Sequence, residues 1–226
     1  MLDALAARPY PGRACLAGRA GDGTPFWAYA LTGRTTASRA RILVESPHGD
    51  VEVRDVRDDG EPDALRHYVA LARRGDWLLV GNGDHVVPLC NDLAAGTDIG
   101  DAFAVPTFEP DPPIYTPRIW LGVRTGSDAT YLGWARRAAD GHAHRGLVSA
   151  AEFDPGFGVL LTTYEGSAVD VRTSAAPMDI RVKAHDIGAL ERELWDALPA
   201  DLRVGGLVVS PKRLRLLSGP AQPTAT

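Results

Sequence analysis

Apolar residues recur along the chain in short runs that turn signals separate, and this pattern predicts many β-strands. Residues 13–19 and 25–31 are two such runs, and Gly21-Asp22-Gly23 between them is typical of a hairpin turn. The same reasoning predicts strands at residues 40–45, 51–53, 76–80, 119–123, 129–135, 159–164 and 206–210. The chain therefore starts with β structure and continues mainly as strands.

Three segments carry a helical pattern instead. Between Pro62 and Arg74, the apolar residues Leu65, Val69 and Ala72 follow helical spacing, which predicts a helix that ends at Gly75. Residues 89–103 predict one or two short helices, split at Gly96. The third is a helix through Leu198, with Asp186 as its N-cap.

Many strands with few helices indicate the α+β class. Two mainly antiparallel sheets packed face to face, with helices outside them, would use every predicted element in a four-layer α-β-β-α sandwich. The 226 residues are 45% hydrophobic, enough for a real core, and we expect one domain over residues 1–217. Residues 218–226 are expected to form a flexible tail.

Composition and net charge limit the kinds of molecule that the protein is expected to bind. The net charge of -5 argues against a general nucleic-acid surface, although clustered arginines could form a local anion pocket. No apolar run approaches the length that spans a bilayer, and the first ten residues lack a signal-peptide core, so we expect a cytoplasmic protein with no membrane role. Cys15 and Cys90 lack CxxC spacing, and the six histidines show no zinc pattern, so no metal site is predicted.

The segment from Phe108 to Arg118 combines acid, hydroxyl and guanidinium groups with four prolines. Each proline fixes its own φ and restrains the residue before it, so Glu109 and Arg118 have little freedom to lose when a ligand binds. A loop that only connects two strands has no need of such rigidity. This segment is therefore the first candidate for a site.

Other candidate segments have plain structural explanations when taken alone. Residues 33–41 carry three arginines and three hydroxyls, which suit phosphate or carboxamide oxygens but also fit a solvated basic turn. Gly81-Asn82-Gly83-Asp84-His85 could present amides to a ligand or form a tight turn, with His85 as a surface group. Tyr68 could be a proton donor or an amphipathic residue at a core edge.

Two familiar motifs are rejected. Residues 18–23 superficially match a dinucleotide fingerprint, but they lie between two hairpin strands instead of opening a helix. The chain has no nucleophile-elbow motif and no evident N-terminal nucleophile, so covalent catalysis is not expected.

Taken in order, these segments resemble the archaeal-type IMP cyclohydrolase family. The resemblance spans residues 10–164 and is carried by Tyr10-Pro11-Gly12-Arg13, the arginine loop 33–39, Tyr68, Asn82-Gly83-Asp84-His85, Glu109, Thr116-Pro117-Arg118-Ile119 and Thr163-Tyr164-Glu165. It implies a fold related in architecture to N-terminal nucleophile hydrolases, without their nucleophile. It also implies closure of the pyrimidine ring of 5-formamidoimidazole-4-carboxamide ribotide (FAICAR) to inosine monophosphate and water in purine biosynthesis, with no metal or organic cofactor, in an enzyme that forms homo-oligomers.

The resemblance also implies roles for residues. Arg39 would hold or polarise the substrate amide, Tyr68 would donate or relay a proton at the formyl oxygen, and Glu109 would manage the amide proton or the leaving water. The implied contacts to the nucleotide come from Arg34, Ser38, Asn82, Gly83, His85, Thr116 and Arg118.

Two departures from the family pattern leave the substrate open. Tyr115 stands where a small polar residue is expected, and the Glu109 loop is one residue longer. The alternatives are a related cyclase that acts on a purine nucleotide analogue in specialised metabolism, and a noncatalytic nucleotide-binding protein. Retention of Arg39, Tyr68 and Glu109 favours ring-closing chemistry over the second alternative.

Overall fold

Two antiparallel β-sheets form the centre of the computed structural model, which describes residues 2–57, 65–127, 129–150, 152–174 and 176–218. The helices are α1 (Asp3–Ala6), α2 (Thr36–Arg39), α3 (Val86–Ala94), α4 (Ile99–Phe103) and α5 (Ile187–Ala197). The strands are β1 (Arg13–Arg19), β2 (Pro25–Thr32), β3 (Arg41–Glu45), β4 (Val51–Asp55), β5 (Tyr68–Arg74), β6 (Trp77–Gly81), β7 (Arg118–Arg124), β8 (Thr130–Arg137), β9 (Ala143–Ala150), β10 (Phe157–Thr162), β11 (Met178–Arg181), β12 (Arg203–Ser210) and β13 (Arg213–Ser218).

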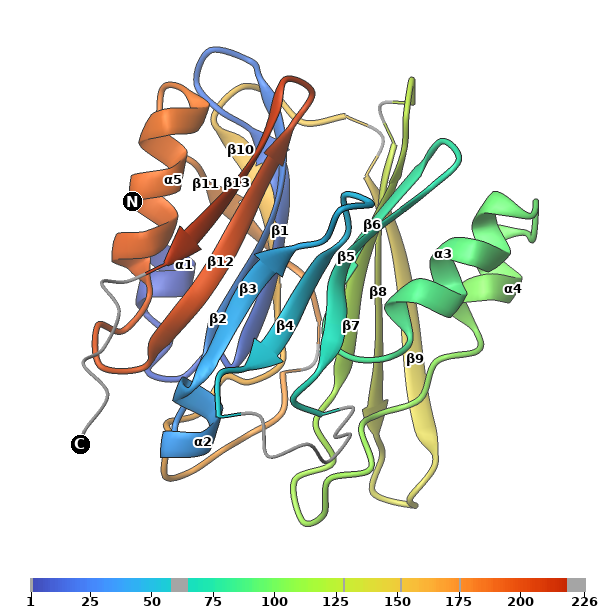
Figure 1. The fold of residues 1–226 in the computed structure, drawn as a ribbon, viewed down its shortest axis with the longest axis vertical. Helices are drawn as coiled ribbons and strands as arrows, with labels where there is room; N and C mark the ends of the chain where they lie inside the picture. Colours follow the sequence, from blue (N-terminus) through green and yellow to red (C-terminus); the bar gives the residue numbers. More distant parts are fainter. Residues whose placement is uncertain (1, 58–64, 128, 151, 175, 219–226) are drawn as a thin grey trace.

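The predicted four-layer α+β sandwich is confirmed. One sheet has six strands in the order β11-β10-β1-β2-β12-β13, and the other has seven in the order β3-β4-β5-β6-β7-β8-β9. Figure 1 shows α1 and α5 on the outer face of the six-stranded sheet and α3 and α4 beside the seven-stranded sheet. The two sheets face each other in the middle.

Alternating side chains of the strands fill the spaces between the layers. In β1, Ala14 and Leu16 pack toward α1 and α5, whereas Cys15 and Ala17 pack into the space between the sheets. Trp120 of β7 lies in a further cluster under α3 and α4. Three hydrophobic clusters thus hold the four layers together. Because successive side chains of a strand point to opposite faces of the sheet, the position of a residue along its strand decides which cluster it joins.

The antiparallel pairing gathers particular strand ends at one edge of the sandwich. Arg13 begins β1 opposite Leu31 near the end of β2, and Arg118 begins β7 opposite Ala135 near the end of β8. The starts of β1, β3, β5 and β7 therefore lie at the same end as the finishes of β2, β4, β6 and β8. We call this edge the polar end, because the candidate site residues described below lie there.

The predicted helix between Pro62 and Arg74 is wrong over its described part. Residues 68–74 form β5, which pairs with β4 and β6, while residues 58–64 lie outside the described structure. A central strand is buried on both faces and reads as a continuous apolar run, so helical spacing within Val69–Ala72 arose by chance. Gly75, with φ +57°, is the first residue of the two-residue loop that joins Arg74 to Trp77.

The other predicted helices are confirmed. Residues 86–94 and 99–103 form α3 and α4, which separate at Gly96. The Asp186 side chain accepts a hydrogen bond from the Ala189 amide at 2.8 Å and so caps α5. No described helix has both the length and the apolar character that a membrane crossing requires.

The hairpin turn at residues 21–23 is confirmed, but three strands escaped the sequence analysis. β9, β11 and β13 are edge strands of their sheets and expose many side chains, so they lack a long apolar run. β13 ends at Ser218, the residue at which the predicted tail begins. Residues 219–226 of that tail lie outside the described structure.

Candidate active site

Glu109 lies at the polar end, in the proline-rich loop before β7, and only 2% of it is exposed. Its Oε1 accepts a hydrogen bond from Asn82 Nδ2 at 2.8 Å, and its Oε2 lies 3.4 Å from Arg13 Nη2. Burial raises the pKa of Glu109, and the positive charge of Arg13 opposes that rise. Glu109 is thus a buried carboxylate fixed by one amide and one guanidinium group.

Asn82 holds this carboxylate because its own amide is fixed by the backbone. Its Nδ2 also donates to the Pro117 carbonyl at 3.0 Å, and its Oδ1 accepts from the Ile119 amide at 2.6 Å. Asn82 follows the end of β6 directly and is fully buried. The amide plane is therefore set before any ligand arrives, which is the preorganisation that a binding site requires.

Gly83 lies between the polar groups of three other residues. A Cβ atom built on Gly83 would lie 3.5 Å from both Arg118 Nε and His85 Nδ1 and 3.6 Å from Glu109 Oε1. Gly83 has φ +107°, a conformation that other residues rarely adopt. The structure thus brings together four predicted site residues, Gly83, His85, Glu109 and Arg118.

The expectation that His85 is a surface group is wrong, because only 7% of this residue is exposed. Burial and then the charge of Arg118 lower the pKa of His85 to about 3, so the imidazole is neutral. Neither ring nitrogen makes a hydrogen bond of good geometry within the described residues, although the Ile119 backbone lies close enough to act weakly on the ring. Its ring meets Trp120 edge-on, with 5.2 Å between ring centroids.

Arg118 begins β7, and its side chain is 14% exposed. Its guanidinium group pairs with Asp84 and donates to the Thr107 carbonyl at 3.4 Å. Its Nε is buried and has no hydrogen-bond partner among the described residues. Arg118 and His85 together therefore present unused polar atoms beside Gly83, which an oxygen-rich ligand could satisfy.

Tyr68 begins β5 and meets Tyr29 of β2 across the space between the sheets. Their hydroxyl oxygens lie 2.7 Å apart, and both residues are buried. The buried guanidinium groups of Arg13 and Arg41 act electrostatically on both hydroxyls. Burial alone would lower the pKa of Arg13, but Glu109 and the neighbouring tyrosines raise it well above its ordinary value. Arg13 thus connects the Glu109 carboxylate with the tyrosine pair.

Thr116 is buried, and its hydroxyl serves the loop itself. Thr116 Oγ1 donates to Asp111 Oδ2, so the Tyr164 hydroxyl is the donor in its contact with Thr116 Oγ1. The Thr116 amide also donates to Asp111 Oδ1 at 2.6 Å. Burial raises the pKa of Tyr164 to about 12, which keeps this donor protonated. These contacts tie the proline-rich loop to the chain that leaves β10.

The arginine loop lies at the same end but is joined less closely to this cluster. Ser38 and Thr35 form the capping box of α2, and Arg34 is exposed with its Nη1 3.4 Å from the Ala168 carbonyl. Arg39 is half-buried in the last turn of α2, and no contact among the described residues joins it to Tyr68 or Glu109. Arg41, two residues later, instead lies near Tyr68, Tyr29 and Arg13.

Four residues of the cluster were absent from the predicted site: Arg13, Tyr29, Arg41 and Tyr164. Three of them lie within or beside motifs that the sequence analysis quoted. Arg13 could have been found from its period, because it shares a strand face with Cys15 and Ala17 and begins an otherwise buried strand. Tyr29 lies inside an apolar run and gave no signal of its own.

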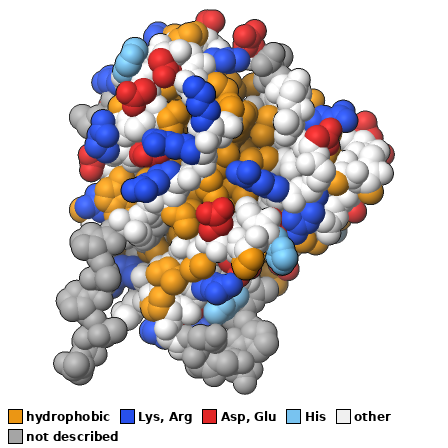
Figure 2. Space-filling model, turned by 45° about the horizontal axis from the view of Figure 1, so that its top comes forward, with side chains coloured by type: hydrophobic (Ala, Val, Ile, Leu, Met, Phe, Trp, Pro, Cys, Tyr) orange, Lys and Arg blue, Asp and Glu red, His pale blue; other side chains and the backbone are white. Residues whose placement is uncertain are grey.

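A small hollow also lies at the opposite end of the sandwich. It is lined by Gly18, Arg19, Pro25, Trp27, Ser127, Thr130 and Phe153. Arg19 ends β1, whereas Arg13 begins it, so this hollow is separate from the polar end. Figure 2, in which this end is tilted toward the viewer, shows a band of hydrophobic side chains flanked by Lys and Arg. Trp27 Nε1 is already bonded to Thr130 Oγ1 at 3.2 Å, and this hollow is no candidate for the chemistry.

Among the residues that the structure describes, no group of three His, Cys, Asp or Glu side chains is arranged to hold a metal ion. A search of curated proteins gave no match. A family model described as IMP cyclohydrolase-like protein matches residues 10–213, a span that holds strands β1 to β12 and every residue of the buried cluster at the polar end. The chain therefore belongs to the IMP cyclohydrolase-like family.

Proposed function

We propose that the protein closes the pyrimidine ring of FAICAR to give inosine monophosphate and water. Membership of the family supports a cyclohydrolase. The observation that carries the proposal is the buried contact of Glu109 with Arg13 and Asn82, next to the unused polar atoms of His85 and Arg118. This arrangement offers a carboxylate for proton transfer beside donors that suit a nucleotide.

The reaction needs three things from its surroundings. The carboxamide nitrogen attacks the formyl carbon, so a carbon–nitrogen bond forms and negative charge develops on the formyl oxygen. One proton leaves the carboxamide nitrogen and another leaves the formamide nitrogen, and the formyl oxygen departs with two protons as water. The protein must fold the two substituents together, accept a proton and stabilise that oxygen.

In this proposal Glu109 accepts the carboxamide proton and returns it to the departing oxygen. A buried carboxylate with a raised pKa suits both steps, because it is a stronger base than an exposed carboxylate and can still return the proton it has accepted. Tyr68 donates its hydroxyl proton to the formyl oxygen and is reprotonated by the proton that leaves the formamide nitrogen. The positive charge of Arg13 offsets the charge that develops between Tyr68 and Glu109. Asn82 keeps the carboxylate in one orientation.

The rest of the nucleotide lies, in the same proposal, along the polar end of the sandwich. His85, Gly83 and Arg118 contact the ribose or the 5′-phosphate, for which a guanidinium group offers paired donors. Arg34, Ser38 and Thr116 complete that surface, and Arg39 reaches the substrate amide from the end of α2. Within this set, Arg39 has the least support from contacts, and Arg41 is the better-placed guanidinium group for the reacting atoms.

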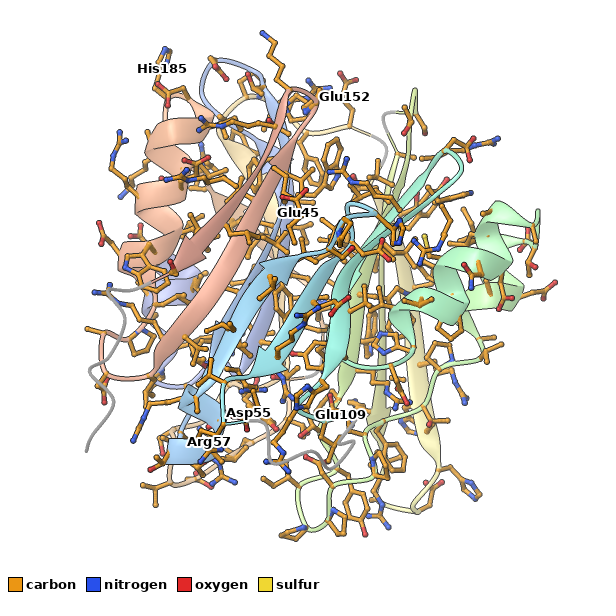
Figure 3. All side chains as sticks on the ribbon, in the orientation of Figure 1. Glu45, Asp55, Arg57, Glu109, Glu152 and His185 are labelled. Atoms are coloured by element: carbon orange, nitrogen blue, oxygen red, sulfur yellow. The ribbon has the colours of Figure 1, made fainter. Side chains whose placement is uncertain are left out.

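The first test is the absorbance change when purified protein meets FAICAR, with inosine monophosphate confirmed chromatographically. Glu109→Gln is the key variant, because it keeps the shape of the side chain and removes its charge. Glu152→Gln is the matched control, since Figure 3 places Glu152 far from Glu109 and its side chain is 74% exposed. We expect rapid closure by the wild type and by the control, and a loss of roughly 100-fold or more in Glu109→Gln.

The outcomes separate the alternatives. Tight binding of inosine monophosphate without any acceleration of ring closure would overturn the proposal in favour of a noncatalytic nucleotide-binding protein. Closure of an analogue in preference to FAICAR would keep the chemistry and change the substrate. Equal rates for Glu109→Gln and wild type would remove Glu109 from the mechanism.

A further inference from the structure

The hydroxyl groups of Tyr29 and Tyr68 share one hydrogen bond, and the number of protons they carry decides which of the two is the donor. Each phenol carries one proton, and only one of the two can lie between oxygens 2.7 Å apart. Tyr29 is completely buried, and the Tyr68 hydroxyl is the one hydrogen-bond partner of its hydroxyl among the described residues. Tyr68 retains 6% exposure. The pair is therefore asymmetric: Tyr29 is fully buried, whereas Tyr68 keeps a small exposed surface.

Consider first a Tyr68 proton that points to Tyr29. The Tyr29 proton would then have no acceptor within the described residues and would be buried without a hydrogen bond, which is unfavourable. In the opposite direction, Tyr29 donates to Tyr68, and the Tyr68 proton is free to meet a ligand. The second arrangement leaves the unpaired proton on Tyr68, the residue of the pair that keeps some exposure.

The charged groups around the pair favour the same direction. Arg13 on β1 and Arg41 on β3 are the cations that act on Tyr29, while Tyr68 faces it from β5. Guanidinium groups donate and cannot accept, so they offer no acceptor for the Tyr29 proton. Burial raises the pKa of Tyr29 well above its ordinary value, which keeps that proton in place.

We propose that Tyr29 is a positioning residue: it donates its proton to the Tyr68 oxygen and thereby directs the Tyr68 proton toward the substrate. This inference rests on the proposed function, in which Tyr68 is the proton donor. When Tyr68 gives up its proton, the hydrogen bond from Tyr29 stabilises the oxygen that remains. Tyr29 thus contributes through Tyr68 without touching the substrate.

The test compares Tyr29→Phe, Tyr68→Phe and the double variant in the ring-closure assay. We expect Tyr29→Phe to lower kcat roughly 10- to 100-fold, as the loss of a hydrogen bond to a developing charge predicts, with KM changed by less than about two-fold. The double variant should be no slower than Tyr68→Phe alone, because Tyr29 acts only through Tyr68. The alkaline limb of kcat in Tyr29→Phe should move to higher pH.

Tyr131→Phe is the matched control, because Tyr131 packs against Trp77 on the helix side of the seven-stranded sheet. A wild-type protein without ring-closing activity would overturn the proposed function and this inference with it. An active wild type with unchanged kcat and pH profile in Tyr29→Phe would overturn the inference alone. Additive losses in the double variant would do the same, since they would show an effect independent of Tyr68.

Discussion

Arg13 Nη2 lies 3.4 Å from Glu109 Oε2, and this pair joins the two sheets at the polar end. Arg13 belongs to β1 of the six-stranded sheet, and Glu109 precedes β7 of the seven-stranded sheet. The two side chains are 10% and 2% exposed, so both charges have left most of their water. A buried pair of this kind is strongly destabilised when one partner is removed alone.

Arg13→Met should therefore lower the free energy of unfolding by about 3–5 kcal/mol, because it leaves the Glu109 charge buried without its partner. Adding Glu109→Gln should restore most of that stability, since the double variant buries no unpaired charge. Ring closure should stay abolished in both variants. Urea denaturation monitored by tryptophan fluorescence checks the first two statements, and the absorbance assay checks the third.

A double variant as unstable as Arg13→Met would contradict this account. It would mean that Arg13 stabilises the fold by packing and not by its charge.

His85 makes stability depend on pH. Burial and the charge of Arg118 lower its folded-state pKa to about 3, below the unfolded value of about 6.5. The unfolded chain binds this proton first, so the contribution of neutral His85 is complete above pH 6.5 and declines as pH falls toward 3. The free energy of unfolding is therefore expected to fall by roughly 2 kcal/mol between pH 7 and pH 5.

This dependence is measured as the free energy of unfolding at several pH values in wild type and in His85→Gln. The variant should show a slope between pH 7 and pH 5 that is smaller by about 1 kcal/mol per pH unit. His48→Gln, which removes an exposed histidine, is the matched control. Parallel curves for wild type and His85→Gln would show that His85 does not carry the effect.

Gly83→Ala should separate backbone strain from ligand binding. Gly83 has φ +107°, and an added methyl group would stand between Arg118, His85 and Glu109. Gly96 has φ +93° with no atom within 4 Å of an added Cβ, so Gly96→Ala carries similar strain without the obstruction. Both variants should lose about 1–2 kcal/mol of stability.

Only Gly83→Ala should weaken binding of inosine monophosphate, by roughly 10-fold or more, because a methyl group cannot replace the polar contacts it blocks. Isothermal titration calorimetry on the two variants measures this difference. Equal affinities would show that the space beside Gly83 is not used by the nucleotide.

Gly133 of β8 lies opposite Trp120 of β7, and the indole ring of Trp120 covers it. A Cβ atom at Gly133 would meet the Trp120 ring at 2.3 Å, whereas at Gly122 it would lie 3.4 Å from Leu79. Gly133→Ala should therefore cost about 1–3 kcal/mol, and Gly122→Ala distinctly less. Thermal denaturation ranks the two variants, and a larger loss for Gly122→Ala would contradict the packing described here.

The layers of the fold were predicted from the sequence more accurately than some of the individual strands. Hairpin β1–β2 and helix α5 carry strong local signals, a turn with two glycines and an Asp cap, and both were found. Strand β9 was missed because its side chains are mostly exposed and its sequence mixes polar and apolar residues without a long apolar run. Strand β5 was taken for a helix because a strand buried on both faces shows no alternation.

The site was predicted in part for a related reason. Glu109 and Arg118 lie on a loop whose prolines mark it in the sequence, and Asn82 follows a strand end. Arg13 and Tyr29 belong to regular strands, and only pairing between distant segments brings them to the same place. No local pattern encodes that convergence.

The position of β1 has a consequence for the chain as it leaves the ribosome. β1 pairs with β2 at once, but its other neighbour is β10, and Ala14 lies opposite Thr162. Until nearly three quarters of the chain has been synthesised, one side of a strand destined for the middle of a sheet has exposed amides and carbonyls. The nascent protein is therefore most prone to aggregation during this interval, and shielding by a chaperone would matter most before Phe157–Thr162 emerges.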